Sequence, residues 1–196
     1  WNASVKEQYA ETSGLFDRWI QEKVLRQDPE PCYYLMRHSF ALAGKDLERL
    51  GLIASVGLED YQTRQVLPHE YTEAPAIRDR VLLMESLSAN ISPIMSLYRD
   101  AAGLLERVLK QVMGGAPEID AKDGSGNATA LWRISDTKVQ DRIREFFTGR
   151  PIYLADGHHR YEAARQYQLD RHAEDPSAKA ANLAHNFVMM NLISFD

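Results

Sequence analysis

The stretch Pro151-Ile-Tyr-Leu-Ala-Asp-Gly-His-His-Arg-Tyr-Glu-Ala-Ala164 decides the fold prediction for this sequence of 196 residues. The apolar run 152–155 predicts a buried strand, Asp156-Gly157 predicts a tight turn, and the residues that follow have a helical pattern. The first N–H groups of a helix have no partner within it, so this order of elements makes a ready anion site. Arg160 would lie beside it. The stretch therefore points toward phosphate or nucleotide chemistry.

Outward from this stretch, the chain alternates helical and strand-like patterns. Apolar residues at three- and four-residue spacing predict an amphipathic helix with one buried face over 13–26, and further helices within 73–85, 101–113 and 136–147. Apolar runs predict strands at 32–42, 52–58, 94–98 and 187–193, with the last central in a sheet. We therefore predict a mixed α/β fold with about five helices and six or seven strands.

Two further expectations concern organisation. The turn Asp123-Gly-Ser-Gly-Asn127 predicts a β-hairpin. It lacks the regular acidic spacing of a calcium loop, so no metal site is assigned to it. We expect residues 1–196 to form one domain. Because the chain begins at Trp1 without a methionine, we also expect it to be an internal piece of a longer protein.

Composition restricts the class of protein. A hydrophobic content of 44% and a net charge of -5 suit a globular protein and argue against direct DNA contact by this segment. The single cysteine, Cys32, excludes internal disulfides and a multi-cysteine zinc site, and it is either a small core residue or a reactive thiol. No apolar run has the length of a membrane span, and no basic-then-apolar leader is present, so we expect a soluble, cytoplasmic protein.

The Asp156–Arg160 turn has a structural and a functional interpretation. In the first, Asp156 caps the helix, Gly157 provides a positive φ, and both histidines face solvent. In the second, the N–H groups of His158 and His159 and the guanidinium of Arg160 converge on phosphate oxygens. Asp156 would then orient a histidine, accept a proton, or bind Mg²⁺ carried by a nucleotide. Adjacent histidines on a helix diverge by about 100 degrees, so this pair alone predicts no metal site.

The pair His69-Glu70, in Leu67-Pro-His-Glu-Tyr-Thr72, is the other candidate for chemistry. Histidine titrates near neutrality and a neighbouring carboxylate can orient it, so the pair could transfer protons or bind a ligand. The alternative is a surface loop whose side chains hydrogen-bond locally. No Walker or Gly-x-Gly-x-x-Gly run occurs, which disfavours a P-loop or a Rossmann cofactor site.

These motifs together resemble the uncharacterised prokaryotic domain-of-unknown-function family 1015, often labelled ParB-like. The resemblance rests on the following ordered motifs: Arg49-Leu-Gly-Leu-Ile53, Leu58-Glu-Asp-Tyr61, Leu67-Pro-His-Glu-Tyr-Thr72, Asp79-Arg-Val-Leu82, Asn90-Ile-Ser-Pro-Ile94, Leu131-Trp132 and Tyr153-Leu-Ala-Asp-Gly-His-His-Arg-Tyr-Glu-Ala-Ala164. It implies a ParB/sulfiredoxin-like core, a mixed sheet with flanking helices, in which related proteins bind nucleoside triphosphates and some phosphorylate free serine.

Carried over by motif, the resemblance implies that Gly157, His158, His159 and Arg160 contact phosphate. Asn90 and Ser92 would be at the pocket rim, and His69, Glu70 and Asp156 are the candidate catalytic residues. Arg80 is either a structural ion-pair partner or a ligand contact. We expect a nucleotide (ATP, ADP or CTP) with Mg²⁺ as cofactor, and a phosphotransferase or nucleotide hydrolase as the activity.

Two other classes compete with this hypothesis. The first is a DNA-associated or regulatory binding module, as the ParB label suggests. The second is a scaffold domain in which the Asp156–Arg160 motif is only structural. Sulfiredoxin-like reductase chemistry is disfavoured, because Cys32 is far in sequence from the turn.

Overall fold

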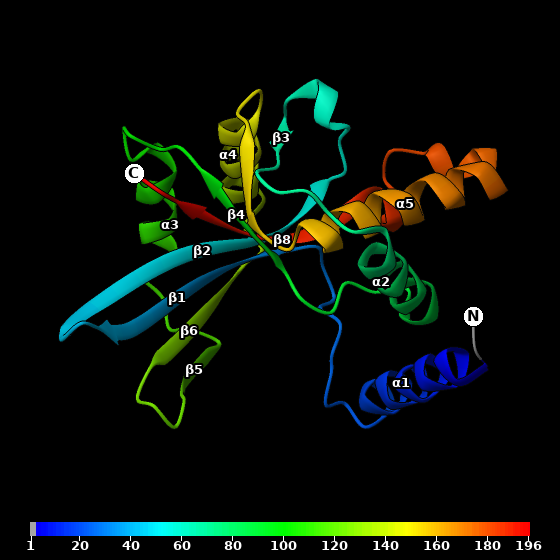
Figure 1. Ribbon diagram of the computed structural model, residues 1–196. Coiled ribbons are helices and arrows are strands. Elements are labelled where there is room, and N and C mark those ends of the chain that lie inside the picture. The colour runs from blue at the N-terminus through cyan, green and yellow to red at the C-terminus, as the bar shows by residue number, and fades with distance from the viewer. Residues whose placement is uncertain (1–2) are drawn as a thin grey trace.

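Eight strands form one mixed sheet in the order β3-β7-β4-β8-β2-β1-β6-β5, and five α-helices accompany it in residues 3–196, the part of the chain that the computed structural model describes (Figure 1). The strands are β1 Tyr33–Leu42, β2 Lys45–Gly57, β3 Val66–Leu67, β4 Ile94–Tyr98, β5 Ile119–Lys122, β6 Ala128–Ile134, β7 Ile152–Asp156 and β8 Phe187–Ser194. The helices are α1 Ala3–Gln21, α2 Ala74–Leu87, α3 Leu104–Val112, α4 Thr137–Phe147 and α5 His158–Glu174. The predicted mixed α/β class is confirmed.

Strand register explains why the core is continuous. Across five adjacent strands, residues that face each other in register form one buried row: Leu35, Leu52, Leu192, Ser96 and Leu154, each at most 2% exposed. Neighbours in each strand point to the opposite face because side chains alternate. In the next row, Tyr153 and Leu97 are half-buried, whereas Ile193, which pairs with Leu97, is 6% exposed. Helices α3, α4 and α5 add buried side chains to the same core as this row, so they cover that face of the sheet. Strand β8 lies at the centre of the sheet, as its apolar sequence predicted.

Helix α1 corrects a prediction. It begins at Ala3, earlier than expected, and ends at Gln21, and its C-terminal apolar residues do not form a buried face. Trp19 is 41% exposed and Ile20 is 50% exposed. The helix lies apart from the sheet and beside α2 (Figure 1). The apolar spacing of α1 showed which face of the helix could be buried, but not whether another element covers it. Within the described chain, α1 packs mainly against α2.

The predicted hairpin at 123–127 is confirmed and joins β5 to β6. Asp123 holds the turn itself, since its carboxylate accepts hydrogen bonds from the Ser125 N–H, the Asn127 N–H and the Asn127 side-chain amide at 2.8–2.9 Å. These bonds lower the pKa of Asp123, with the Asn127 side chain as the largest cause. The carboxylate of Asp123 therefore stabilises the turn.

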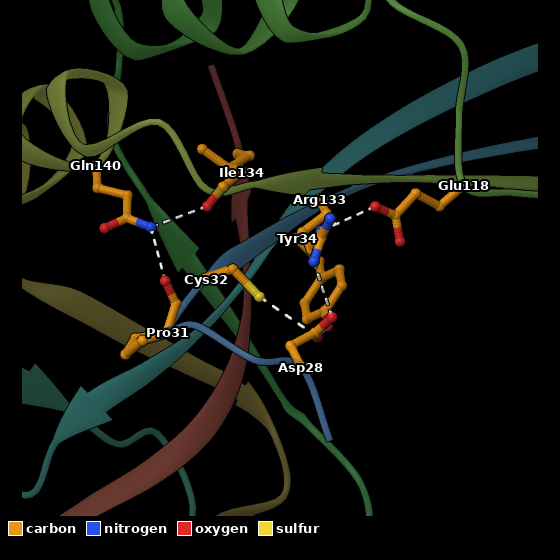
Figure 2. A network of polar contacts seen from close by, with 8 residues as sticks. All are labelled: Asp28, Pro31, Cys32, Tyr34, Glu118, Arg133, Ile134 and Gln140. Atoms are coloured by element: carbon orange, nitrogen blue, oxygen red, sulfur yellow. Dashed lines mark hydrogen bonds and ion pairs between the residues drawn. The ribbon is translucent and has the colours of Figure 1, made fainter. Parts of the chain in front are cut away.

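A polar network fixes the segment before β1 to the sheet (Figure 2). Asp28 accepts hydrogen bonds from the Tyr34 hydroxyl and from Arg133 Nη1 at 3.2 Å, and Arg133 Nε pairs with Glu118 Oε1 at 2.9 Å. Cys32 Sγ lies 3.5 Å from Asp28 Oδ2. Burial, followed by the Asp28 carboxylate, raises the pKa of Cys32 to about 11. Because the thiolate is the reactive form, the raised pKa favours a packing role for Cys32 over that of a reactive thiol.

Candidate functional site at the start of helix α5

Three chain segments meet where β7 passes into α5. Strand β3 runs parallel to β7, so both strands end at the same edge of the sheet. Strand β4 runs antiparallel to β7, with Met95 opposite Asp156, so it begins at that edge. The loop 68–73 therefore lies on one side of the 156–160 turn and the loop 88–93 on the other. Helix α2 joins the two loops and packs against α5.

Gly157 is the pivot of the turn. Its φ of 95° lies in the left-handed region, where glycine has no steric cost. A Cβ at this position would come within 2.7 Å of Arg160 Nη2 and 2.9 Å of Arg160 Cζ. The missing side chain thus makes room for the guanidinium of Arg160, which lies across the turn. The sequence predicted the positive φ, but it could not show that Arg160 fills the space above Gly157.

Arg160 binds the loop before β4. Its Nη1 donates to Ser92 Oγ at 2.9 Å and to the Pro93 carbonyl at 2.7 Å, and its Nη2 donates to Asp156 Oδ2 at 2.8 Å. The Asp156 side chain is 73% exposed and the Arg160 side chain is 28% exposed. Arg160 is therefore held in a fixed place at the helix start, with part of the guanidinium still open to solvent.

His158 points to the opposite side, toward the loop after β3. It is 1% exposed, and its Nε2 accepts a hydrogen bond from the His69 backbone N–H at 3.2 Å. An accepting Nε2 places the proton of the neutral ring on Nδ1. Glu70 Oε1 lies 3.2 Å from this Nδ1, but off the direction of a hydrogen bond, so Nδ1 has no aligned partner.

The charge state of His158 follows from its surroundings. Burial lowers the pKa of His158 below its ordinary value of 6.5, more than the nearby Glu70 carboxylate raises it. The ring is therefore neutral near pH 7. A buried polar atom without an aligned partner is rare in native proteins and tends to mark a functional position.

His69 has the features of a proton acceptor. Its Nδ1 lies 2.7 Å from the Leu154 carbonyl, and since a carbonyl oxygen only accepts, Nδ1 carries the proton. Nε2 is then the basic nitrogen, and no described residue hydrogen-bonds to it. The His69 residue is exposed, and its ring stands edge-on to that of His158 at 4.5 Å between centroids. The backbone of β7 thus fixes both the tautomer and the orientation of His69.

The side chain of His159 contacts a different segment from that of His158. Its Nε2 accepts a hydrogen bond from the Glu73 N–H at 3.2 Å. Glu73 is the residue before α2 and makes no capping hydrogen bond with its own side chain. The imidazole of His159 therefore satisfies a donor beside the start of α2 and joins this helix to α5. This contact favours a structural role for the side chain, although its backbone N–H remains at the start of α5.

The helix start itself offers two donors. The N–H groups of Arg160 and Tyr161 both donate to the Gly157 carbonyl, at 2.9 and 3.0 Å. The N–H groups of His158 and His159 precede the first hydrogen bond of the helix, so no carbonyl of α5 can satisfy them. They lie at the positive end of the helix dipole and beside Arg160, an arrangement that favours an anion.

The carboxylates do not form a metal site built by the protein. In the described part of the chain, no cluster of three or more histidine, cysteine, aspartate or glutamate residues is placed to hold a metal ion. Asp156 is already paired with Arg160. The residues present therefore do not fit a resident Mg²⁺, and we derive no chemical step through one.

The structure brings most of the predicted site residues together. His69, Glu70 and His158 form one cluster, and Arg160 joins Asp156 to Ser92 on the other side of Gly157. Asn90 lines a cavity with Arg160. Sequence reasoning missed the partners that fix these side chains, the carbonyls of Pro93 and Leu154 and the N–H of Glu73. No sequence signal could have found them, because every residue has such backbone groups.

Fold and site together define a mixed α/β protein with a histidine–carboxylate cluster at a strand–turn–helix junction. The family described as protein of unknown function (DUF1015) matches residues 2–196, and the chain belongs to that family. The family membership predicted from the motifs is thus confirmed. No curated protein and no solved structure matches the chain. No helix in residues 3–196 is long and apolar enough to cross a membrane.

Proposed function

We propose that this chain carries the site of a phosphotransferase or nucleotide hydrolase. The observation that carries the proposal is His69, an exposed imidazole whose tautomer is fixed by the Leu154 carbonyl so that Nε2 is free to take a proton. It stands beside the helix start of α5, which favours an anion. A positioned base and an anion site are the two parts that phosphoryl transfer needs from a protein.

In the proposed reaction, His69 Nε2 accepts the proton of a hydroxyl group, from water or from an alcohol. The hydroxyl oxygen bonds to the terminal phosphorus of the nucleotide as the bond from that phosphorus to the rest of the nucleotide, the leaving group, breaks. The proton on His69 then passes to solvent. A positioned base of this kind contributes about 10²–10⁴-fold to the rate.

His158 and Glu70 support His69. The buried, neutral His158 accepts the His69 N–H and so holds the loop at the helix start. Glu70, with its side chain 49% exposed, lies on the solvent side of the same ring. A rotation of this carboxylate would bring it into line with His158 Nδ1. Glu70 and His158 are therefore positioning residues, and His69 is the proposed base.

The phosphate would lie at the His158 and His159 N–H groups with Arg160 beside it. Each hydrogen bond to a charged group stabilises such a complex by about 1.5–3 kcal/mol. Arg160 already donates to Asp156 and Ser92, so an incoming phosphate would compete with these oxygens for the guanidinium. The exposed Asp156 is the partner that can move away at least cost.

The test is a turnover assay with ATP, ADP and CTP in the presence of Mg²⁺, together with the melting temperature of the full chain with each nucleotide. We expect a nucleotide to raise the melting temperature. We also expect His69→Asn, which keeps a donor for Leu154 but removes the base, to reduce turnover by about 10²-fold or more without removing the thermal shift. His38→Asn on β1 is the control and should leave both readouts unchanged. No thermal shift and no turnover with any nucleotide would refute the proposal.

A further inference from the structure

A cavity of about 270 Å³ opens on the Arg160 side of the turn, between α2, the loop before β4 and β8. Its lining has an apolar part and a polar part. The apolar residues are Leu83, Met84, Ala89, Ile91, Ile94 and Val188, and the polar residues are Arg80, Asn90, Ser92 and Arg160. A small concave space of this composition, apolar with a few converging polar groups, is typical of a small-molecule site.

The apolar part of the lining reaches into the core. Ile94 is fully buried and Val188 is 2% exposed, and both lie on the helix-covered side of the sheet. Leu83 and Met84 come from α2. These side chains are aliphatic, and no aromatic ring is among them, so the cavity offers contact to a compact aliphatic body but no stacking surface.

The polar part of the lining is cationic. Arg160 is held by Ser92 and Pro93 as described above, and Arg80 of α2 also lines the cavity, with its side chain 51% exposed. Arg80 Nη1 is 3.4 Å from Asp79 Oδ2, a loose pair. The other oxygen of Asp79 accepts a hydrogen bond from the Tyr9 hydroxyl of α1. Because Asp79 is shared, Arg80 can turn toward a ligand at small cost.

Among the residues that the structure describes, no carboxylate lines this cavity. Asp79 and Asp156 both pair with the arginines but do not belong to the lining. Two guanidinium groups without an acidic partner in the cavity favour a carboxylate or phosphate and disfavour an ammonium group.

We infer that this cavity binds the second substrate of the proposed phosphotransferase, a small organic anion with a compact aliphatic body, a hydroxyl group and no ammonium group. Its anionic group pairs with Arg80, while Arg160 stays beside the nucleotide phosphate, and its body contacts Leu83, Met84 and Val188. This assignment rests on the proposed function, because it takes the hydroxyl of the bound anion as the phosphoryl acceptor. The free serine implied by the family resemblance does not suit the lining, since its ammonium group would find no carboxylate there and would face two arginines.

The test is isothermal titration calorimetry on the full chain with four probes that share one branched body: isocaproate, isoamyl phosphate, isoamyl alcohol and leucine. We expect one or both anions to bind about tenfold or more tightly than the alcohol, the effect of one charge-assisted pair. The comparison of the two anions shows whether the cavity takes a carboxylate or a phosphate. Leucine is isocaproate with an added ammonium group and should bind about tenfold or more weakly than isocaproate.

Two variants locate the binding. Arg80→Met keeps the aliphatic stem and should weaken anion binding about tenfold while leaving the alcohol unchanged. Ala89→Leu narrows the cavity and should weaken all four probes. Arg171→Met is the matched control, because Arg171 is also an exposed helix arginine with one carboxylate partner, Glu174, and should change nothing. Circular dichroism and the melting temperature confirm that each variant is folded.

The outcomes separate the two proposals. Equal binding of all probes, no binding of either anion, or an Arg80→Met variant with unchanged affinity overturns the cavity assignment. Nucleotide turnover without anion binding overturns this assignment alone. Anion binding that depends on Arg80, without nucleotide binding or turnover, supports the cavity and overturns the proposed function.

Discussion

Replacing Gly157 by alanine tests whether the turn is built around Arg160. An alanine at a φ of 95° has backbone strain of about 1–2 kcal/mol. Its Cβ would also stand 2.7–2.9 Å from three atoms of the Arg160 guanidinium, so Arg160 has to move. Moving it breaks its hydrogen bonds to Ser92, Pro93 and Asp156, each of which contributes about 0.5–1.5 kcal/mol.

These terms add to about 2.5–6.5 kcal/mol in the free energy of unfolding, and the partial exposure of the side chains lowers the upper end to about 5 kcal/mol. For a chain of this size, the corresponding fall in melting temperature is about 2–4 °C for each kcal/mol. The assay is urea unfolding followed by circular dichroism, with the thermal midpoint as a second readout.

Gly126→Ala is the matched control. Gly126 has a φ of 86°, close to that of Gly157, but a Cβ there meets nothing within 4 Å. Gly126→Ala should therefore lower the free energy of unfolding only by the backbone strain, about 1–2 kcal/mol. In an Arg160→Ala background, Gly157→Ala should lower the free energy of unfolding by the same amount as Gly126→Ala, because the clash of the new Cβ with the Arg160 guanidinium is removed. An equal cost of the two glycine substitutions in the unchanged chain would refute the reasoning.

Three further substitutions test other parts of the structure. Asp100 is a buried carboxylate that accepts hydrogen bonds from three backbone N–H groups at the start of α3, at 2.7–2.9 Å. Asp100→Ala should lower the free energy of unfolding in urea by about 2 kcal/mol, and a loss below about 0.5 kcal/mol would contradict this role. Burial lowers the pKa of His158. The stability that the neutral ring contributes is therefore complete above about pH 6.5 and is lost as the pH falls through the lowered pKa. His158→Gln should flatten the pH dependence of the free energy of unfolding below pH 6.5. Gly51→Ala should cost about 1–3 kcal/mol, since its Cβ would overlap the buried Asn191 amide, whereas Gly57→Ala on the same strand meets nothing and should be nearly neutral.

Part of the fold could be predicted because it depends on local patterns. The apolar run of β8 made it a central strand, and the turn at 123–127 produced the hairpin. The helix predicted within 136–147 is present as α4, and the carboxylate of Asp136 caps it by accepting the Lys138 N–H at 2.8 Å. The two-residue strand β3 was missed as a strand, because Val66–Leu67 is too short for a periodic pattern and exists through its pairing with β7.

The exposed apolar side of α1 could not be predicted for a related reason. Spacing shows that Trp19 and Ile20 share a face, but whether another element covers that face is a property of the assembled fold. The same holds for Cys32, whose raised pKa comes from burial and from Asp28, its neighbour across a turn.

The strand, the turn and the helix start at 152–160 follow from the sequence, because a buried apolar run, a glycine and a helical pattern act over a few residues. The sequence also made His69, Glu70 and Arg160 candidate site residues. Which of these residues lie close together depends on the pairing of the strands. The parallel pairing of β3 with β7 brings His69 and Glu70 to His158, and the antiparallel pairing of β4 brings Ser92 to Arg160. The adjacent residues His158 and His159 bind different backbone groups, the N–H of His69 and the N–H of Glu73, because successive positions on a helix point in different directions.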